Sequence, residues 1–280
     1  MSEMAAHILD LEGKPTAKEV EIPDVFSRPL RPDIILRAFW IVRSHGIQPY
    51  GRDPQAGEKT SAESGWPPTG RGISRIPRVK GERSRRAGQA AAVASVVGGR
   101  LPHPPKAEKV IYNKINRKEK RLALETAIAF TGDANAVAWR GHRVGTLEFP
   151  LVVSDDIESI SKTAELHSFF EKAGLSEELK RLYRGVKRRS GKPRMRGRAY
   201  KEPIGPLIVV TNDRGISRAA EAIPGAKAVT IDSLSILQLA PAGVAGRLTF
   251  WTESSLDALR SKNGSSSSNN NKEVEMKIEA

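Results

Sequence analysis

The stretch Pro206-Leu-Ile-Val-Val-Thr-Asn-Asp213 decides the expected fold, because an apolar run of strand length ends there in polar residues. Helical periodicity follows it over Ile216–Ile223. Uninterrupted apolar strands are typical of parallel sheets that are covered by helices on both faces. The stretch therefore predicts one strand-and-helix unit of an α/β protein.

The same unit recurs on both sides of this stretch. The further pairs are Phe149–Val153 before Ile157–Ala173, Ala226–Ile231 before Leu234–Leu239, and Leu248–Thr252 before Glu253–Arg260. Repeated alternation of strand and helix favours a single, mostly parallel sheet flanked by helices.

The N-terminal part of the body contributes a hairpin and three helices to the expected fold. Ala6–Leu11 and Ala17–Ile22 flank a turn-like Glu12-Gly-Lys-Pro15, which indicates a hairpin. The predicted helices cover Pro32–His45, the segment from Asn116 to about Phe130, and Ala134–Arg140 before Gly141. Asn116-Arg-Lys-Glu119 predicts a capping box for the second of them.

The charge of the chain is distributed very unevenly. The 280 residues carry 46 Lys and Arg against 32 Asp and Glu, a formal net charge of +14. Residues 45–106 hold 11 of these cations against 4 acids, and residues 180–201 hold 11 cations and no acid. The rest of the chain sums to −4. Two basic segments on a slightly acidic body predict a polyanion as partner.

The first basic segment also has an unusual backbone composition, with 10 Gly and 8 Pro in residues 45–106. Such a density opposes regular helices and strands. We therefore expect residues 46–106 to be an extended loop that orders against a large partner. It would be inserted into one globular body made of residues 1–45 and 107–260, with a disordered polar tail over residues 261–280.

Several classes of site and location are disfavoured. The chain has no cysteine, which excludes disulfides and thiolate chemistry. Its longest strongly apolar run, Ala90–Val97, is far shorter than a membrane span, and the N-terminus lacks the pattern of a signal peptide. We expect a soluble intracellular protein with no cofactor, metal, membrane or small-molecule partner.

The residues at the ends of the predicted strands leave open the hypothesis that the protein is an enzyme. Asp155, Asp156 and Asp213 each follow a predicted strand, where doubly wound folds bind ligands. Ser154, Asp155 or Asn212 could instead cap the following helix, which the sequence favours. The five histidines (His7, His45, His103, His142 and His167) are scattered and form no metal-binding pair.

The basic segments hold the candidate binding residues. In the second, Leu175, Leu179, Leu182 and Val186 predict an amphipathic helix, which leaves a membrane or a partner groove as an alternative. The Gly- and Arg-rich Ser190–Lys201 that follows favours phosphate binding instead. The candidates are Arg52, Arg71, Arg75, Arg78, Lys80, Arg83, Arg85, Arg86, Arg100, His103, Lys106, Lys187, Arg188, Arg189, Lys192, Arg194, Arg196, Arg198 and Lys201.

Two aromatic residues of the first segment, Tyr50 and Trp66, have two possible roles. They could stack on unpaired bases, which is how proteins commonly recognise RNA loops. They could equally anchor the loop on protein.

Ten stretches, in order along almost the whole chain, resemble the archaeal–eukaryotic branch of large-subunit ribosomal protein four, the universal L-four family. They are Pro23–Phe26, Thr60–Ser64, Thr69–Gly72, Arg75–Gly81, Gly98–Lys109, Val152–Asp156, Met195–Arg198, Pro206–Val210, Leu239–Pro241 and Gly246–Glu253. Each is weak alone, but their ordered conjunction is specific.

The resemblance implies a Rossmann-like body and a long loop threaded into ribosomal RNA (rRNA), in a non-enzymatic, ribosome-bound cytoplasmic protein. It implies that the loop tip, with Trp66, Arg71 and Arg75, lines the nascent-peptide exit tunnel beside ribosomal protein L-twenty-two. Ser64-Gly-Trp-Pro-Pro68 departs from the usual family order at this tip. Some relatives also regulate their own messenger RNA, so an extraribosomal regulator stays an alternative, as does a nucleotide-acting enzyme.

Overall fold

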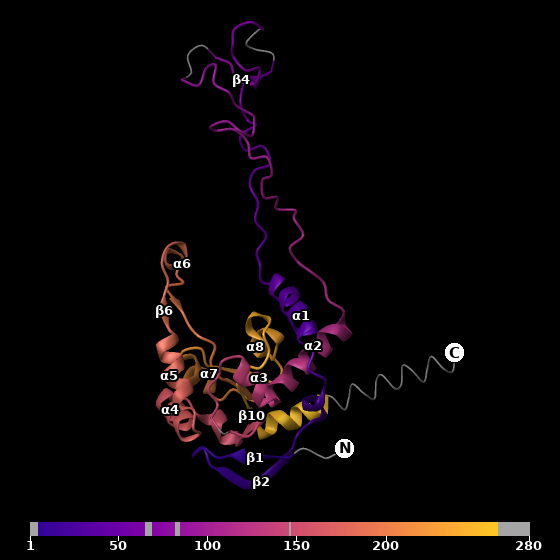
Figure 1. Cartoon of the computed structure of the whole chain (residues 1–280), viewed down its shortest axis with the longest axis vertical. Coiled ribbons are helices and arrows are strands. Elements are labelled where there is room, and N and C mark those ends of the chain that lie inside the picture. The colour runs from indigo at the N-terminus through magenta and orange to yellow at the C-terminus, as the bar shows by residue number, and fades with distance from the viewer. Residues whose placement is uncertain (1–4, 65–68, 82–84, 146, 263–280) are drawn as a thin grey trace, which may run out of the picture. The chain divides into compact units, whose positions relative to one another are not determined.

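The computed structural model describes residues 5–64, 69–81, 85–145 and 147–262. Its internal contacts divide the chain into two units. The first, called the body here, comprises Met1–Arg43 and Lys114–Ala280, and the second, called the loop unit, comprises Ser44–Asn113. Figure 1 shows the elements of both.

A six-stranded sheet forms the centre of the body, in the order β2-β1-β5-β10-β8-β9. The strands are β1 (Ala5–Leu9), β2 (Pro15–Glu21), β5 (Leu151–Val153), β8 (Leu207–Val210), β9 (Lys227–Thr230) and β10 (Thr249–Thr252). Only the predicted β1–β2 hairpin pairs antiparallel, while the other four pairings are parallel. The expected α/β fold with a mostly parallel sheet is confirmed.

The central strands β5, β8 and β10 are buried at every position because each of their faces meets a separate core. Phe250, Ile208 and Val210 belong to one cluster of buried side chains, and Trp251 and Val209 belong to the other. Successive side chains of a strand point to opposite faces, so one apolar run supplies both cores. The burial of the sheet on two sides follows directly from the pattern in the sequence.

Helices cover both faces of the sheet, as Figure 1 shows. The first core includes residues of α3 (Ala134–Trp139), α4 (Thr163–Lys172), α5 (Ser176–Gly185) and α7 (Ile216–Glu221). The second includes residues of α1 (Pro32–Ser44), α2 (Arg117–Ala129), α8 (Ile236–Leu239) and the helix at residues 253–262. Short 3-10 turns complete the body: η1 (Asp24–Ser27), η2 (Phe130–Gly132), η3 (Asp155–Ser159) and η4 (Pro241–Gly243).

The expected single helix over Ile157–Ala173 is wrong. The chain forms η3 first, and α4 begins only at Thr163. Within η3, the buried Glu158 accepts a hydrogen bond from the backbone N–H of Thr211 at 2.8 Å. This contact at the end of β8 holds η3 against the sheet, so η3 does not continue into α4. The helix nevertheless ends as expected, with Gly174 at a φ of +80°.

The capping box predicted at Asn116 is also wrong, although α2 begins at the next residue. The Asn116 side chain makes no capping hydrogen bond. Glu119, the expected partner, instead pairs with Arg37 of α1 at 3.1 Å. A capping box does form at the start of α8, between Ser235 and Gln238. The tertiary ion pair therefore displaces the local motif.

The loop unit contains little regular structure among its described residues. β3 (Ala62–Glu63) and β4 (Arg78–Val79) pair antiparallel, and Arg78 also bridges to Ala90. Nearer its ends, the backbone N–H of Arg52 donates to Pro105 at 3.2 Å, and that of Asn113 donates to the Ser44 hydroxyl. Two segments distant in sequence thus lie against each other within this unit.

The C-terminal helix extends to residue 262, two residues further than expected, and the remaining residues of the predicted tail lie outside the described part of the chain. Among the described helices, none has both the length and the apolar character needed to cross a bilayer.

Candidate nucleic-acid interface

The basic segment of the body is carried by α5, whose apolar stripe fixes it to the core. Leu175, Leu179 and Leu182 are buried, while Val186 is half-buried. Lys180 and Arg184 on the opposite side are exposed. The apolar stripe predicted from the sequence is therefore used for packing inside the protein, which removes the reason to expect a membrane there.

Beyond α5 the chain forms a short two-stranded ribbon, here called the arm (residues 186–202). β6 (Lys187–Arg188) pairs antiparallel with β7 (Tyr200–Lys201), and a one-turn helix, α6 (Lys192–Met195), lies between them. The backbone N–H of Arg189 donates to Ala199 at 2.8 Å and extends the ribbon. The sequence did not predict this ribbon, because two-residue strands leave no periodic pattern.

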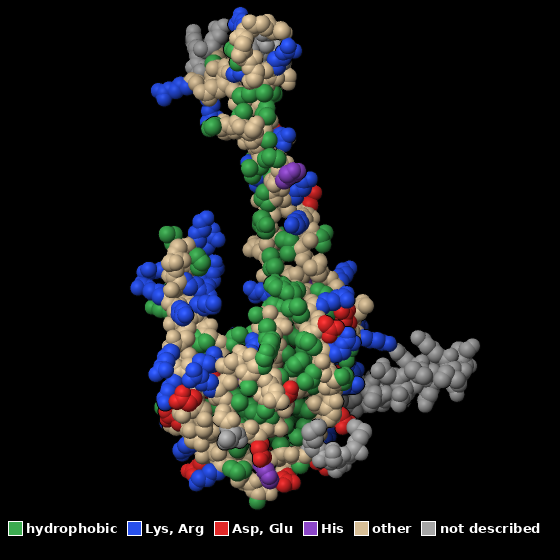
Figure 2. Space-filling view, in the orientation of Figure 1, with side chains coloured by type: hydrophobic (Ala, Val, Ile, Leu, Met, Phe, Trp, Pro, Cys, Tyr) green, Lys and Arg blue, Asp and Glu red, His purple; other side chains and the backbone are tan. Residues whose placement is uncertain are grey.

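The arm concentrates positive charge, as Figure 2 shows over the elements labelled β6 and α6 in Figure 1. None of its cations forms an ion pair with an acid in the part of the chain that the structure describes. All but the half-buried Arg189 are exposed: Lys187, Arg188, Lys192, Arg194, Arg196, Arg198 and Lys201. A row of cations without internal partners is suited to a phosphate backbone.

The base of the arm is held by a buried polar network around Glu178 of α5, a carboxylate that is 1% exposed. It accepts hydrogen bonds from Arg181 at 2.6 and 2.7 Å and from the backbone N–H of Arg143 at 3.0 Å. His142 Nδ1 lies 2.6 Å from the same carboxylate. Arg181 also donates to the Ile204 carbonyl at 2.6 Å, which ties α5 to the chain just after the arm.

Burial and hydrogen bonding shift the pKa of Glu178 in opposite directions. Burial by itself would raise the pKa of Glu178, but its hydrogen bonds to Arg181 and His142 outweigh it and hold the pKa at about 2. Burial lowers the pKa of His142, which stays neutral and donates its Nδ1 proton to Glu178. Arg181 and His142 therefore serve the fold, and neither is available to a ligand.

In the loop unit, the candidate cations differ in their partners and in their exposure. Lys80 pairs with Glu63, and Arg100 pairs with Glu58 at 3.2 Å. Exposed cations that form no ion pair with a described acid are Arg71, Arg75, Arg85 and Lys106. The partly exposed Arg52 and the exposed Arg86 and His103 also lie in this unit.

Arg78 has an internal role in the loop unit. Its guanidinium donates to the carbonyl of Gly88 at 2.8 Å and to that of Ser74 at 3.2 Å, and the residue is half-buried. These contacts hold the chain on both sides of β4. Two other predicted residues, Arg83 and the tip residue Trp66, lie outside the described residues.

The carboxylates at the strand ends are engaged in backbone hydrogen bonds. Asp213 accepts from the backbone N–H groups of Gly215 at 3.0 Å and Ser217 at 3.4 Å at the start of α7, and so takes the place that the sequence favoured for Asn212. Ser154, another expected cap, makes no capping hydrogen bond to η3. Asp155 accepts from the backbone N–H of Ser254 at 3.0 Å, at the start of the helix at residues 253–262. Asp155 thus caps a helix distant in sequence, which a local capping rule does not predict.

No cluster of three or more His, Asp or Glu residues with metal-binding geometry occurs within the described ranges.

Comparison with known proteins identifies the family of the chain. The model of the ribosomal protein L4/L1 family matches residues 20–262. The chain belongs to this family. The match includes all of the loop unit and all of the arm.

Family relatives match the chain over nearly its whole length. The large ribosomal subunit protein uL4 of Saccharolobus islandicus is 44% identical over 254 residues, which cover 90% of this chain and 92% of the relative. The uL4 proteins of Methanosphaera stadtmanae and Methanocaldococcus jannaschii are each 41% identical, covering 90% and 92% of this chain and 95% and 99% of the relatives. The resemblance to the archaeal L-four family is confirmed.

Proposed function

We propose that this chain is a structural, non-enzymatic constituent of the large ribosomal subunit that binds large-subunit rRNA through the arm and the loop unit. The observation that carries the proposal is the arm, whose exposed cations form no ion pair with a described acid, on a body whose other residues sum to no net charge. Phosphate groups would supply the missing counter-charges. Relatives named as large-subunit proteins support the same reading.

The tip of the loop unit would contribute to the wall of the nascent-peptide exit tunnel, beside ribosomal protein L-twenty-two. Arg71 and Arg75 support this part of the proposal, since both are exposed and carry charge at the expected tip. Cations that neutralise rRNA phosphates would stabilise the folded RNA around the tunnel. The protein would be cytoplasmic and ribosome-bound.

Sedimentation through a sucrose gradient tests the proposal. A structural constituent comigrates with the large subunit in near-stoichiometric amount, whereas a messenger-bound regulator or a free enzyme stays near the top of the gradient. If about ten cations contact phosphates, affinity for rRNA falls by roughly 10³–10⁵ between 50 and 200 mM salt. Free migration of the chain, or salt-independent binding, would contradict the proposal.

A further inference from the structure

Two tyrosines near the ends of the loop unit differ in their surroundings. Tyr112 stacks on His45, with ring centroids 4.2 Å apart and an interplanar angle of 19°. Tyr50 is 64% exposed, and no described residue stacks on its ring or hydrogen-bonds to its hydroxyl. One tyrosine therefore completes the internal structure of this unit, while the other presents a free aromatic face.

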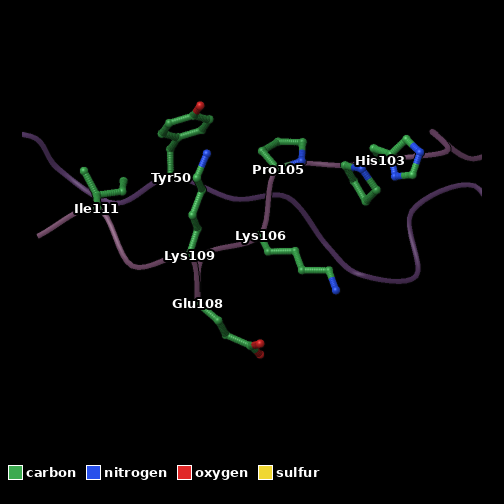
Figure 3. Close-up of a pocket in the computed structure, with 8 residues that line it drawn as sticks. Tyr50, His103, Pro105, Lys106, Glu108, Lys109 and Ile111 are labelled. Carbon is green, nitrogen blue, oxygen red and sulfur yellow. The ribbon is translucent and has the colours of Figure 1, made fainter.

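Tyr50 lines an open cleft of about 740 Å³ within the loop unit, shown in Figure 3. The opposite wall comes from the segment between His103 and Ile111 and includes Lys106, Glu108 and Lys109. A cleft of this size is within the range that small ligands occupy. It has ample room for one nucleotide.

The walls of the cleft are fixed by a close backbone crossing next to Tyr50. At Gly51, a Cβ atom would lie 2.5 Å from the backbone nitrogen of Ala107. The neighbouring hydrogen bond from Arg52 to the Pro105 carbonyl holds the same crossing. A turn in which the N–H of Lys109 donates to the carbonyl of Lys106 follows directly. The aromatic ring and the lysines are thus positioned by backbone contacts and need no ligand to bring them together.

The charged side chains of the cleft point in different directions. Figure 3 shows the Tyr50 ring and the Lys109 side chain pointing to one side, and Lys106 and Glu108 pointing to the other. Within the described residues, neither lysine forms an ion pair with an acid, including Glu108. The side that carries the aromatic face therefore carries a cation, and the Glu108 carboxylate is turned away from it.

We propose that this cleft binds a single unpaired nucleotide of RNA, with the base stacked on Tyr50 and its phosphate at Lys109. Stacking suits the free ring, since any base offers a π-face, and Lys109 supplies a donor for a phosphate oxygen. Lys106 contacts the RNA backbone as it leaves the cleft. The inference rests on the proposed function, and it names the kind of RNA element that this part of the loop unit recognises.

Binding of the full-length chain to two RNA probes tests this assignment. Fluorescence anisotropy compares a labelled oligouridine, which is single-stranded, with a labelled RNA duplex that carries the same number of phosphates. We expect Tyr50→Ala to weaken oligouridine binding on the order of tenfold, to leave duplex binding unchanged and to preserve the salt dependence. Lys109→Ala should lower the salt slope on oligouridine by about 0.7.

Two further variants separate stacking from other effects. Tyr50→Phe keeps the ring and should bind oligouridine as the parent chain does. Tyr183→Ala removes a 49% exposed tyrosine on α5 of the body and should have no effect on oligouridine binding. Circular dichroism of each variant reports on folding.

The outcomes also separate this inference from the proposed function. Equal weakening of both probes by Tyr50→Ala, or weakening of neither, overturns the nucleotide site. If Tyr50→Ala impairs comigration with the large subunit but not RNA binding, the cleft holds a neighbouring protein and the inference is again wrong. In each of these cases the proposed function is still supported if the parent chain comigrates with the large subunit. If the parent chain does not comigrate, the proposed function is wrong.

Discussion

At the scale of single residues, buried charges in the body are matched by specific partners. Arg247 is 3% exposed and donates to the carbonyls of Gly205, Gln238 and Gly225 at 2.8 to 3.0 Å. Burial lowers its pKa to about 9, so the guanidinium keeps its charge at neutral pH. Glu178 is one of the buried acids of the body, and its partners include Arg181. These residues fix the body from which the arm projects.

Glu178→Ala should strongly destabilise the body. The change removes the carboxylate that Arg181, His142 and the backbone N–H of Arg143 share, and leaves a partly buried guanidinium without its counter-charge. The expected loss in the free energy of unfolding is about 3–5 kcal/mol, measured by urea denaturation. Glu177→Ala is the matched control, because that neighbouring acid is exposed and its pairs are solvent-screened. Similar losses for the two variants would contradict this account.

The stability of the body should fall as the solution is acidified, in two windows. The folded pKa of His142 lies below its ordinary value of 6.5, so the unfolded state gains a proton first and stability declines as pH falls below about 6.5. For Glu178, stability is present above 4.5 and is lost as pH falls toward its folded pKa of about 2. Urea unfolding at a series of pH values measures both.

His142→Gln tests the loss of stability just below pH 6.5. The glutamine amide still donates to Glu178 but does not titrate. The decline just below pH 6.5 should therefore shrink in this variant, while the acidic window remains. An undiminished decline would assign that window to another histidine.

At the scale of elements, the arm is held by the pairing of its own two strands and by the hydrogen-bond network at its base. The ribbon pairs Arg188 with Tyr200, and the network below it joins α5 to Ile204. Residues 190–198, which lie between the two strands, are all exposed and support no core. Charge in the arm can therefore be removed without loss of folding.

Replacing Arg194, Arg196 and Arg198 together with Ala should weaken rRNA binding and lower the salt slope by about 2 to 3. Thermal unfolding should be unchanged, because the three residues are exposed and pair with no described acid. Filter binding of the full chain at several salt concentrations measures the slope. A triple replacement of Lys14, Lys162 and Lys172, which pair with Glu12 or Glu165, serves as the control. An unaltered slope in the arm variant would mean that these arginines face solvent in the complex.

At the scale of the whole molecule, the body and the loop unit have separate internal contacts. Two faces of a six-stranded sheet supply the cores of the body. The loop unit has short strand pairs and turn hydrogen bonds among its described residues. The energy that folds the body therefore comes from its own burial of apolar side chains.

Deleting residues 65–75, which all belong to the loop unit, should leave the main calorimetric unfolding transition of the body within about 2 °C. Incorporation into functional large subunits should be impaired, as sedimentation and translation assays would measure. A melting temperature lowered by many degrees would show that the loop segment stabilises the body, against this expectation.

The sequence by itself determined the strands of the parallel sheet, the N-terminal hairpin, the stripe of α5 and the two regions of excess charge. These features are local, because periodicity and composition depend only on consecutive residues. Family resemblance added the expected ribosomal role.

Only the tertiary structure decided which charged residues are free. Arg78, Arg181 and Glu119 look like any other charged residue in the sequence, yet each is committed to partners that the fold brings close. Asp155 likewise caps a helix about 100 residues away along the chain. Such pairings depend on contacts between distant segments, which no short stretch of sequence encodes. The same reason separates Tyr50, with its free ring, from the stacked Tyr112.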